Sequence, residues 1–247
     1  MLLIFRLLRQ SALGQTFMLQ RIKTHIKNRI GFYSKSYSQE GEDMVLKRIF
    51  GSNSIGWYID VGAHHPMRFS NTYYFYKQGW QGINIDAMPN IMGEFKKYRP
   101  KDINIHAAIS ENNETLNYYK FTDHAFNTLD DKVGRERENR KKDQFLGKET
   151  MITKRLDEIL EEHLPEGKSI DFLSIDVEGL DLSVLNSNNF DKYRPKIILA
   201  EVSRKTMNEI IDDEVYTLLT SKGYKFFSKT VNTLFFIDEN YMLKRFG

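Results

Sequence analysis

The chain has 247 residues, of which 40% are hydrophobic and 28% are charged, and its formal net charge is +3. This length suffices for one large α/β domain with extensions. Because cysteine is absent, disulfide bonds and thiolate metal sites are excluded. The first 39 residues hold seven of the 36 Lys and Arg residues and none of the 33 Asp and Glu residues, so the remainder carries a net charge of −4. Such a body is not expected to bind nucleic acid, which requires a basic surface on the fold.

The N-terminal segment, residues 1–36, is predicted to be a basic amphipathic helical arm. Its apolar residues recur near helical spacing, with cations between them, at Leu13, Phe17, Met18, Ile22 and Ile26. Such a helix can lie on an anionic membrane surface, so residues 1–30 are expected to make a peripheral membrane contact. The alternative is that the arm packs on the body or on a second subunit, which would make the protein a homo-oligomer.

The start of the chain has the pattern of neither a transmembrane helix nor a secretory signal. The apolar run from Met1 to Leu8 is interrupted at Arg6, whereas a membrane span needs roughly 20 apolar residues. A secretory signal would place its positive charge before the apolar run and a small-residue cleavage site after it. We therefore expect a cytoplasmic protein, with the arm at the inner face of the membrane.

Residues 37–247 are predicted to form one domain in which strands and helices alternate. The first helix is capped by Ser38 and ends at Gly51. Later helices are expected through 73–76, from 89 to 98, at 153–160 and at 212–222. Strands are expected at 57–61, 82–86, 103–109, 116–121, 172–177, 197–202, 224–227 and 233–237.

The order of these elements predicts the fold class. Alternating strands and helices followed by a terminal hairpin are typical of an α/β fold with a doubly wound, mostly parallel sheet and one reversed strand. Residues 122–150 break the pattern, because ten charged residues lie between Asp130 and Lys142. We expect this stretch to be a lid or acceptor loop, with a merely solvated insertion as the alternative.

Three of the predicted strands end in an aspartate: Asp60, Asp86 and Asp176. In open α/β sheets, ligands bind in the crevice outside the carboxyl ends of the strands. The three acids therefore predict one cleft lined by three carboxylates.

The turn after the first strand indicates the class of cofactor. Residues 62–66 contain a single glycine, Gly62, so the Gly-x-Gly-x-x-Gly loop of dinucleotide sites is absent. No stretch matches a P-loop, and Asp60 would repel a phosphate. S-adenosylmethionine fits better, because it carries a sulfonium and no phosphate. Asp86, 26 residues after Asp60, can accept hydrogen bonds from both hydroxyls of its ribose.

Six motifs in order resemble the FkbM family of S-adenosylmethionine-dependent methyltransferases, over roughly residues 37–237. They are Ser38-Gln39-Glu40-Gly41-Glu42-Asp43, Asp60-Val61-Gly62-Ala63-His64-His65-Pro66, Ser70-Asn71-Thr72, Gly79-Trp80-Gln81-Gly82 with Ile85-Asp86-Ala87, Asn127-Thr128-Leu129, and Ile175-Asp176-Val177-Glu178-Gly179. The resemblance implies a class I, Rossmann-like methyltransferase fold with a seven-stranded sheet whose last strand is reversed. It also implies O-methyl transfer to a hydroxyl of a carbohydrate, glycolipid or similar small-molecule acceptor, as in polysaccharide biosynthesis.

The same resemblance implies a set of cofactor-binding residues. Asp60, Gly62 and Ala63 would shape the loop around the methionine and ribose, and Asp86 would hold the ribose hydroxyls. The remaining predicted contacts are Ala87 beside the adenine, a backbone contact from Ala107 or Ala108, Gln39 and Glu40 closing over the cofactor, and Asp176.

Asp176 and Glu178 are the leading candidates for catalysis, together with His65. The two acids alternate along an extended segment that ends at Gly179, so both can face the cleft. Methyl transfer requires alignment of the acceptor oxygen and removal of its proton. A carboxylate or histidine can serve as the base. Alternatively, a divalent metal can acidify the hydroxyl, magnesium being favoured over zinc by oxygen ligands.

Several assignments stay open at this point. His64 and Glu201 could contribute to either the base or the metal arrangement, and His124 could contact the acceptor. The acids could also serve only as structural hydrogen-bond acceptors. The rival functions are a nicotinamide-dependent oxidoreductase on a related fold and a non-catalytic cofactor-binding protein.

Overall fold

The computed structural model describes residues 16, 18–22, 24, 34–51, 54–140, 144–202 and 206–247. The chain divides into two units, residues 1–35 and residues 36–247. In the first unit, the described residues 16, 18–22 and 24 are helical and exposed. Residues 34–36, at the end of the predicted helical arm, are not helical, and the other residues of the arm lie outside the described part of the chain. None of the described helices combines the length and the apolarity that a membrane span requires.

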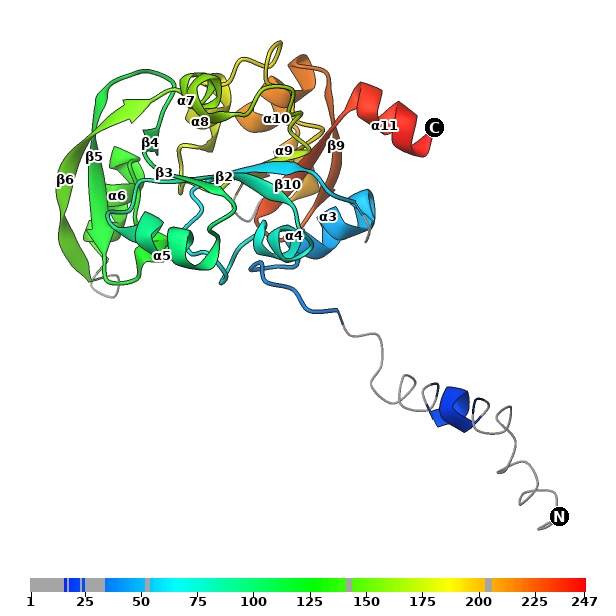
Figure 1. Ribbon diagram of the computed structural model, residues 1–247. Coiled ribbons are helices and arrows are strands. Elements are labelled where there is room, and N and C mark those ends of the chain that lie inside the picture. Colours follow the sequence, from blue (N-terminus) through cyan, green and yellow to red (C-terminus); the bar gives the residue numbers. More distant parts are fainter. Residues whose placement is uncertain are drawn as a thin grey trace, which may run out of the picture. The chain divides into compact units, whose positions relative to one another are not determined.

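The second unit contains a seven-stranded sheet with the order β3-β2-β1-β7-β8-β10-β9 (Figure 1). Neighbouring strands from β3 to β8 are parallel, and β10 runs antiparallel to both β8 and β9. The strands are β1 (Trp57–Val61), β2 (Gln81–Asp86), β3 (Ile103–His106), β7 (Phe172–Ile175), β8 (Ile197–Glu201), β9 (Tyr224–Lys229) and β10 (Thr233–Asp238). This confirms the predicted sheet, in which the last strand of the chain is reversed.

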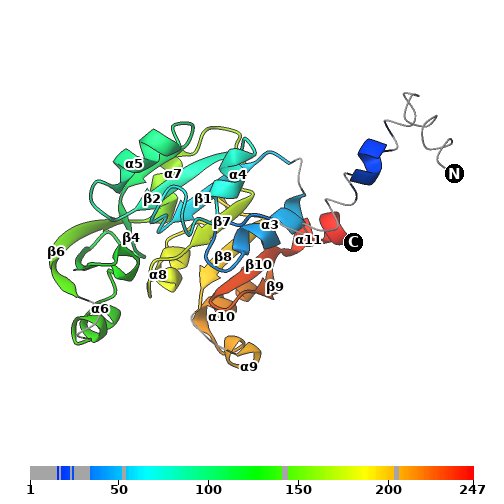
Figure 2. The same ribbon diagram turned by 90° about the horizontal axis from the view of Figure 1, so that it is seen from below.

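Helices cover both faces of this sheet (Figure 2). Successive side chains of each strand point to opposite faces, and the central strands carry apolar side chains on both, so both faces need a covering layer. On one face, Ile59 and its neighbours pack against α7 (Leu156–His163), α8 (Asp181–Asn186) and α10 (Glu214–Ser221). On the other face, Tyr58 packs with α3 (Glu42–Phe50), α4 (Tyr73–Lys77) and α11 (Glu239–Phe246). Both clusters are apolar, which accounts for the continuous hydrophobic runs of the central strands.

A second, three-stranded sheet has the order β4-β6-β5 and lies at one end of the main sheet (Figure 1, green). Its strands are β4 (Ala108–Ile109), β5 (Thr115–Phe121) and β6 (Phe145–Lys154). The single strand predicted at 103–109 is therefore wrong: it divides at Ala107, whose N–H donates to the carbonyl of Asp86 (3.1 Å). The helix predicted from Thr153 begins only at Leu156, because Thr153 and Lys154 pair with β4.

The predicted loop at 122–150 is largely regular structure among its described residues. It contains a 3-10 helix, η1 (His124–Phe126), the helix α6 (Asp131–Glu138) and the first part of β6. Asp130 caps α6 by accepting the N–H groups of Lys132 and Val133, both at 2.8 Å. Among the described residues of the second unit, two further helices are α5 (Ile91–Tyr98) and α9 (Met207–Ile210).

Candidate active site

An open cleft lies at the carboxyl ends of β1, β2 and β7. Its floor comes from the strand ends, and one wall comes from the segment between β5 and α6. Six predicted site residues line it, namely Gln39, Gly62, Asp86, Ala87, Asp176 and Glu178. Ala107, His64 and His124, which were alternatives, also line it.

Gly62 joins three strands at the floor of this cleft. Its φ of 78° is left-handed, and a Cβ on it would lie 1.8 Å from the backbone carbonyl oxygen of Asp176. The N–H groups of Gly62 and Ala63 both donate to the carbonyl of Ile85 (2.9 and 3.2 Å). Only glycine meets both demands, so this residue sets how closely the ends of β1, β2 and β7 approach.

Asp86, at the end of β2, is buried and holds the loop after β1. Its Oδ2 accepts the N–H of His64 and its Oδ1 accepts the N–H of Met88, both at 2.7 Å. Burial raises the pKa of Asp86, and the two N–H donors oppose that rise. Each carboxylate oxygen has a second lone pair, so Asp86 can still accept hydrogen bonds from two hydroxyl groups in the cleft.

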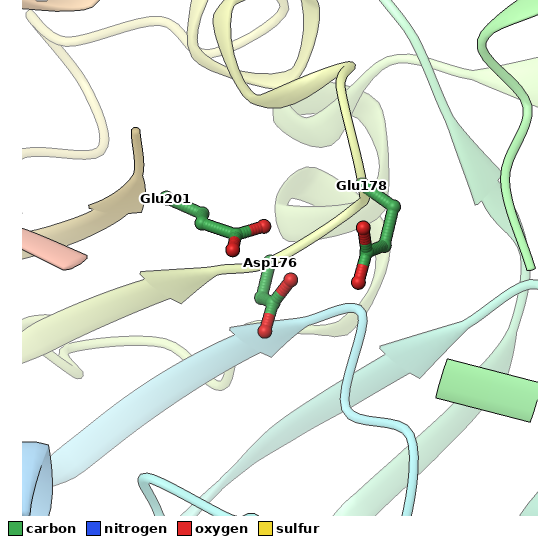
Figure 3. A group of neighbouring side chains, drawn as sticks. All are labelled: Asp176, Glu178 and Glu201. Atoms are coloured by element: carbon green, nitrogen blue, oxygen red, sulfur yellow. The ribbon is translucent and has the colours of Figure 1, made fainter. Parts of the chain in front are cut away.

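Three carboxylates meet on the opposite side, at the ends of β7 and β8. One oxygen from each of Asp176, Glu178 and Glu201 lies within 4.8 Å of the others. Figure 3 shows Glu201 reaching from the end of β8 toward Asp176 and Glu178. No pattern in the sequence indicated that Glu201 lies beside Asp176, because this proximity depends on the parallel pairing of β7 with β8.

Asp176 has a strongly perturbed carboxyl group. The residue is exposed at the surface of the cleft, yet many protein atoms surround its carboxyl group and displace water from it. This desolvation, followed by repulsion from Glu201, Glu178 and Asp181, raises the pKa of Asp176 well above its usual range. A carboxylate with a raised pKa is a stronger base, and it binds a proton at a higher pH than an ordinary aspartate.

Glu178, by contrast, is held by a cation. Its Oε2 accepts a hydrogen bond from Arg137 of α6 at 2.5 Å, and both side chains are mostly buried. The hydroxyl of Thr128 donates to the backbone carbonyl of Glu178 (2.8 Å), whose φ of 54° is left-handed. The segment between β5 and β6 therefore fixes this side of the cleft.

Asp181 lies behind the three acids and was not predicted. It is 4% exposed and accepts the N–H groups of Glu201, at 2.9 Å, and of Val177. Burial raises the pKa of Asp181 to about 8, partly offset by these donors. Its carboxyl group ties the end of β7 to the end of β8.

The two predicted histidines behave differently. The Nδ1 of His65 accepts the N–H groups of Met67 and Arg68, both at 3.0 Å, and His65 does not line the cleft. His64 does line it, and its buried Nε2 has no partner among the residues that the structure describes. Desolvation lowers the pKa of both imidazoles, which favours their neutral forms.

Five of the predicted site residues are absent from the lining: Glu40, Asp60, Ala63, His65 and Ala108. Asp60 is buried away from the cleft, where its carboxylate accepts a hydrogen bond from the hydroxyl of Thr72 (2.6 Å). Arg99, which is fully buried, also donates to that hydroxyl (2.9 Å). Desolvation raises the pKa of Asp60, and Arg99 opposes the rise. Asp60 thus holds the start of α4 against β1.

The other displaced residues have structural neighbours of their own. Glu40 accepts the N–H of Asn232 (2.9 Å), which joins the residues just before α3 to the turn between β9 and β10. Ala63 packs against the apolar side of α5, and Ala108 packs against Tyr118 and Leu129. Ala107 lines the cleft in place of Ala108.

Several lining residues were assigned no role from the sequence. They include Phe69, Met88, Tyr118, Ala125 and Thr128. The Asn127-Thr128-Leu129 motif pointed to this region, but no local pattern indicated that Tyr118 faces the cleft. Its hydroxyl accepts a hydrogen bond from the amide of Asn127 (3.0 Å), a contact that depends on how β5 meets the following segment.

Comparison with known proteins gives one match. A family model described as Methyltransferase FkbM domain matches residues 60–226, more than half of the chain. No curated protein and no solved structure matches the chain. The matched range contains β2, β3, β7 and β8 of the main sheet in full. It begins within β1, at Asp60, ends within β9, at Phe226, and does not include β10.

Proposed function

The chain belongs to the FkbM family of S-adenosylmethionine-dependent methyltransferases, and from this premise we propose that it methylates a hydroxyl group of a carbohydrate or glycolipid. The observation that carries the proposal is the cleft lined by Asp86, Asp176 and Glu178, with Glu201 close to the last two. Its two sides offer different chemistry, hydrogen-bond acceptance on one and proton acceptance on the other.

The residues of the cleft fit the cofactor in the character of their groups. Asp86 keeps lone pairs for two ribose hydroxyls, and Ala87 and Ala107 leave space for a flat base. The loop after β1 lacks the glycines that admit a pyrophosphate, which argues against the nicotinamide alternative. When bound, S-adenosylmethionine supplies the methyl group from a positively charged sulfonium. The acids around Asp176 offer negative charge for such a cation.

Asp176 is our proposed general base. A sugar hydroxyl holds its proton far more tightly than a carboxylic acid, so the base must act as the oxygen–carbon bond forms. The raised pKa of Asp176 suits it to that step, and Glu201 and Glu178 maintain the rise. Glu178 is a weaker candidate, because Arg137 already binds its carboxylate.

A divalent metal is the second arrangement that this site could support. Asp176, Glu178 and Glu201 offer oxygen ligands close together, and such ligands suit magnesium. The ion pair between Arg137 and Glu178 would compete with a metal for one of these carboxylates. We therefore favour the general-base arrangement.

Binding of S-adenosylhomocysteine to the purified protein tests the proposal. Calorimetry should show binding by the wild type, with Asp86→Ala weakening it by about tenfold or more, since a charged hydrogen-bond acceptor is lost. Asp191→Ala, an exposed aspartate on the surface, is the matched control and should bind normally. Melting temperatures measured in parallel separate loss of the site from loss of the fold.

Methyl transfer is then followed by mass spectrometry of glycans incubated with labelled cofactor. A mass increase of one methyl group on a glycan hydroxyl is the expected product. Failure of the wild type to bind S-adenosylhomocysteine, or a preference for a nicotinamide nucleotide, would contradict the proposal. Cofactor binding without transfer to any glycan would favour the non-catalytic alternative.

A further inference from the structure

Phe69 occupies an unusual position at the cleft. It lies in the loop between β1 and α4, its φ of 55° is left-handed, and the residue lines the cleft and is 50% exposed. A bulky side chain seldom adopts a left-handed backbone, because its Cβ crowds the following carbonyl. Such strain persists only where the surroundings impose it, and it concentrates at ligand sites.

The surroundings of Phe69 impose its conformation from both sides. Before it, the imidazole of His65 accepts the N–H of Arg68 (3.0 Å). After it, the N–H of Ser70 donates to the carbonyl of Tyr37 (3.0 Å). The guanidinium of Arg68 lies 5.2 Å from the centre of the Phe69 ring. The loop is therefore built to present this ring, at the cost of a strained backbone.

Two polar side chains accompany the ring in the cleft. Gln39 and His124 both line it, and in the described part of the chain neither side chain has a hydrogen-bond partner. They come from places far apart in sequence, Gln39 from the residues just before α3 and His124 from η1. The cleft thus combines an exposed aromatic ring with an amide and an imidazole that are free to bind a ligand.

We propose that Phe69 is the stacking platform for a pyranose ring of the acceptor, with Gln39 and His124 binding its hydroxyl groups. A pyranose has a face of C–H groups and a rim of hydroxyls, so it matches an aromatic surface bordered by polar side chains. This inference rests on the proposed function and adds the ring form of the acceptor and the residue that selects it. A linear polyol has the hydroxyls but no ring face and should be rejected.

The variant Phe69→Trp provides a direct signal for stacking. The native tryptophans, Trp57 and Trp80, are 9% and 2% exposed, so a fluorescence change on adding sugar reports position 69. The probes are the methyl pyranosides of glucose, galactose, mannose and N-acetylglucosamine, with D-glucitol as the acyclic control. We expect a blue shift with at least one pyranoside and none with D-glucitol. If none of the pyranosides shifts the fluorescence, or if D-glucitol shifts it equally, the proposal is overturned.

Phe69→Ala and Phe69→Gly test the role of the ring in turnover. Both should raise the acceptor KM by about tenfold, the value of one aromatic contact, with a smaller effect on kcat. Phe69→Gly removes the left-handed strain and should not lower the melting temperature. Affinity for S-adenosylhomocysteine should stay at the wild-type value in every variant.

Two further results would count against a stacking role. An unchanged acceptor KM in Phe69→Ala would mean that the ring does not contact the acceptor. A parallel loss of S-adenosylhomocysteine affinity would assign the ring to the cofactor. Failure of the proposed function remains distinguishable, because it appears as absent cofactor binding by the wild type, whereas the fluorescence of the Phe69→Trp variant is measured without cofactor.

Discussion

Asp176 and Glu178 are two residues apart, yet their surroundings give them different chemical character. Glu178 pairs with Arg137, whereas Asp176 lines the cleft beside Glu201, Glu178 and Asp181, which repel its negative charge. The charge of Glu178 is thus balanced by a cation, whereas the proton affinity of Asp176 is raised. Environments that separate two acids in this way are typical of acid–base sites.

The pH profile of kcat/KM for S-adenosylmethionine should report the raised pKa of Asp176. A base works only when unprotonated, so activity should rise with pH as Asp176 loses its proton. Because its pKa is raised, that rise should occur well above the range of an ordinary aspartate. Asp176→Asn should lower kcat by about 10²- to 10⁴-fold, while Asp191→Asn on the surface has no effect. An acid limb near the ordinary aspartate range would remove Asp176 as the base.

At the scale of elements, the site depends on the closeness of strand ends. The turn after β1 crosses directly over the backbone of Asp176, with no room for a side chain at Gly62. The segment from η1 to β6 adds the opposite wall through Thr128 and Arg137. The cleft is therefore shaped by backbone contacts between elements as much as by its lining side chains.

Gly62→Ala should abolish S-adenosylhomocysteine binding and lower the melting temperature. Its new methyl group would lie 1.8 Å from the Asp176 carbonyl oxygen, a contact that requires the strand ends to separate. Gly93→Ala is the matched control, because Gly93 lies in α5 with nothing within 4 Å of the added methyl group. That substitution should be neutral or stabilise the protein by up to about 1 kcal/mol. Normal cofactor binding by Gly62→Ala would show that the close approach is dispensable.

At the scale of the whole chain, charge and fold are divided between two units. The N-terminal unit holds the basic excess, and its described residues Met18, Leu19 and Ile22 expose apolar side chains beside Arg21. The second unit, with its acidic cleft, carries the methyltransferase fold. We propose that the N-terminal unit binds an anionic membrane surface, where a lipid-linked glycan would be presented to the cleft.

Sedimentation with vesicles tests this proposal. The full chain should sediment with vesicles containing phosphatidylglycerol and remain in solution with phosphatidylcholine alone, because the basic residues need anionic headgroups. Added salt should weaken the binding, and deletion of residues 1–30 should abolish it. If the deletion leaves vesicle binding unchanged but alters the oligomeric state, the segment is a subunit contact instead.

The local pattern of the sequence determined the order of strands and helices, the mostly parallel sheet and the aspartates at its carboxyl edge. Apolar runs such as 57–61 and 172–175 are buried on both faces, so hydrophobicity alone locates them. The motifs around Asp86 and Asp176 likewise predicted residues that line the cleft.

Only the tertiary structure decided which acids face one another and which face away. Asp60 and Asp86 both follow apolar runs, yet Asp60 turns to Thr72 and Arg99 while Asp86 lines the cleft. Glu201 joins Asp176 through the register of β7 with β8, and Phe69 reaches the cleft through a strained loop. Strand register and loop closure are set by contacts between residues distant in sequence, whereas hydrophobic periodicity is a property of neighbours. The sequence by itself therefore determined the strands of the main sheet and the floor of the site, and long-range packing decided the second sheet and the walls of the site.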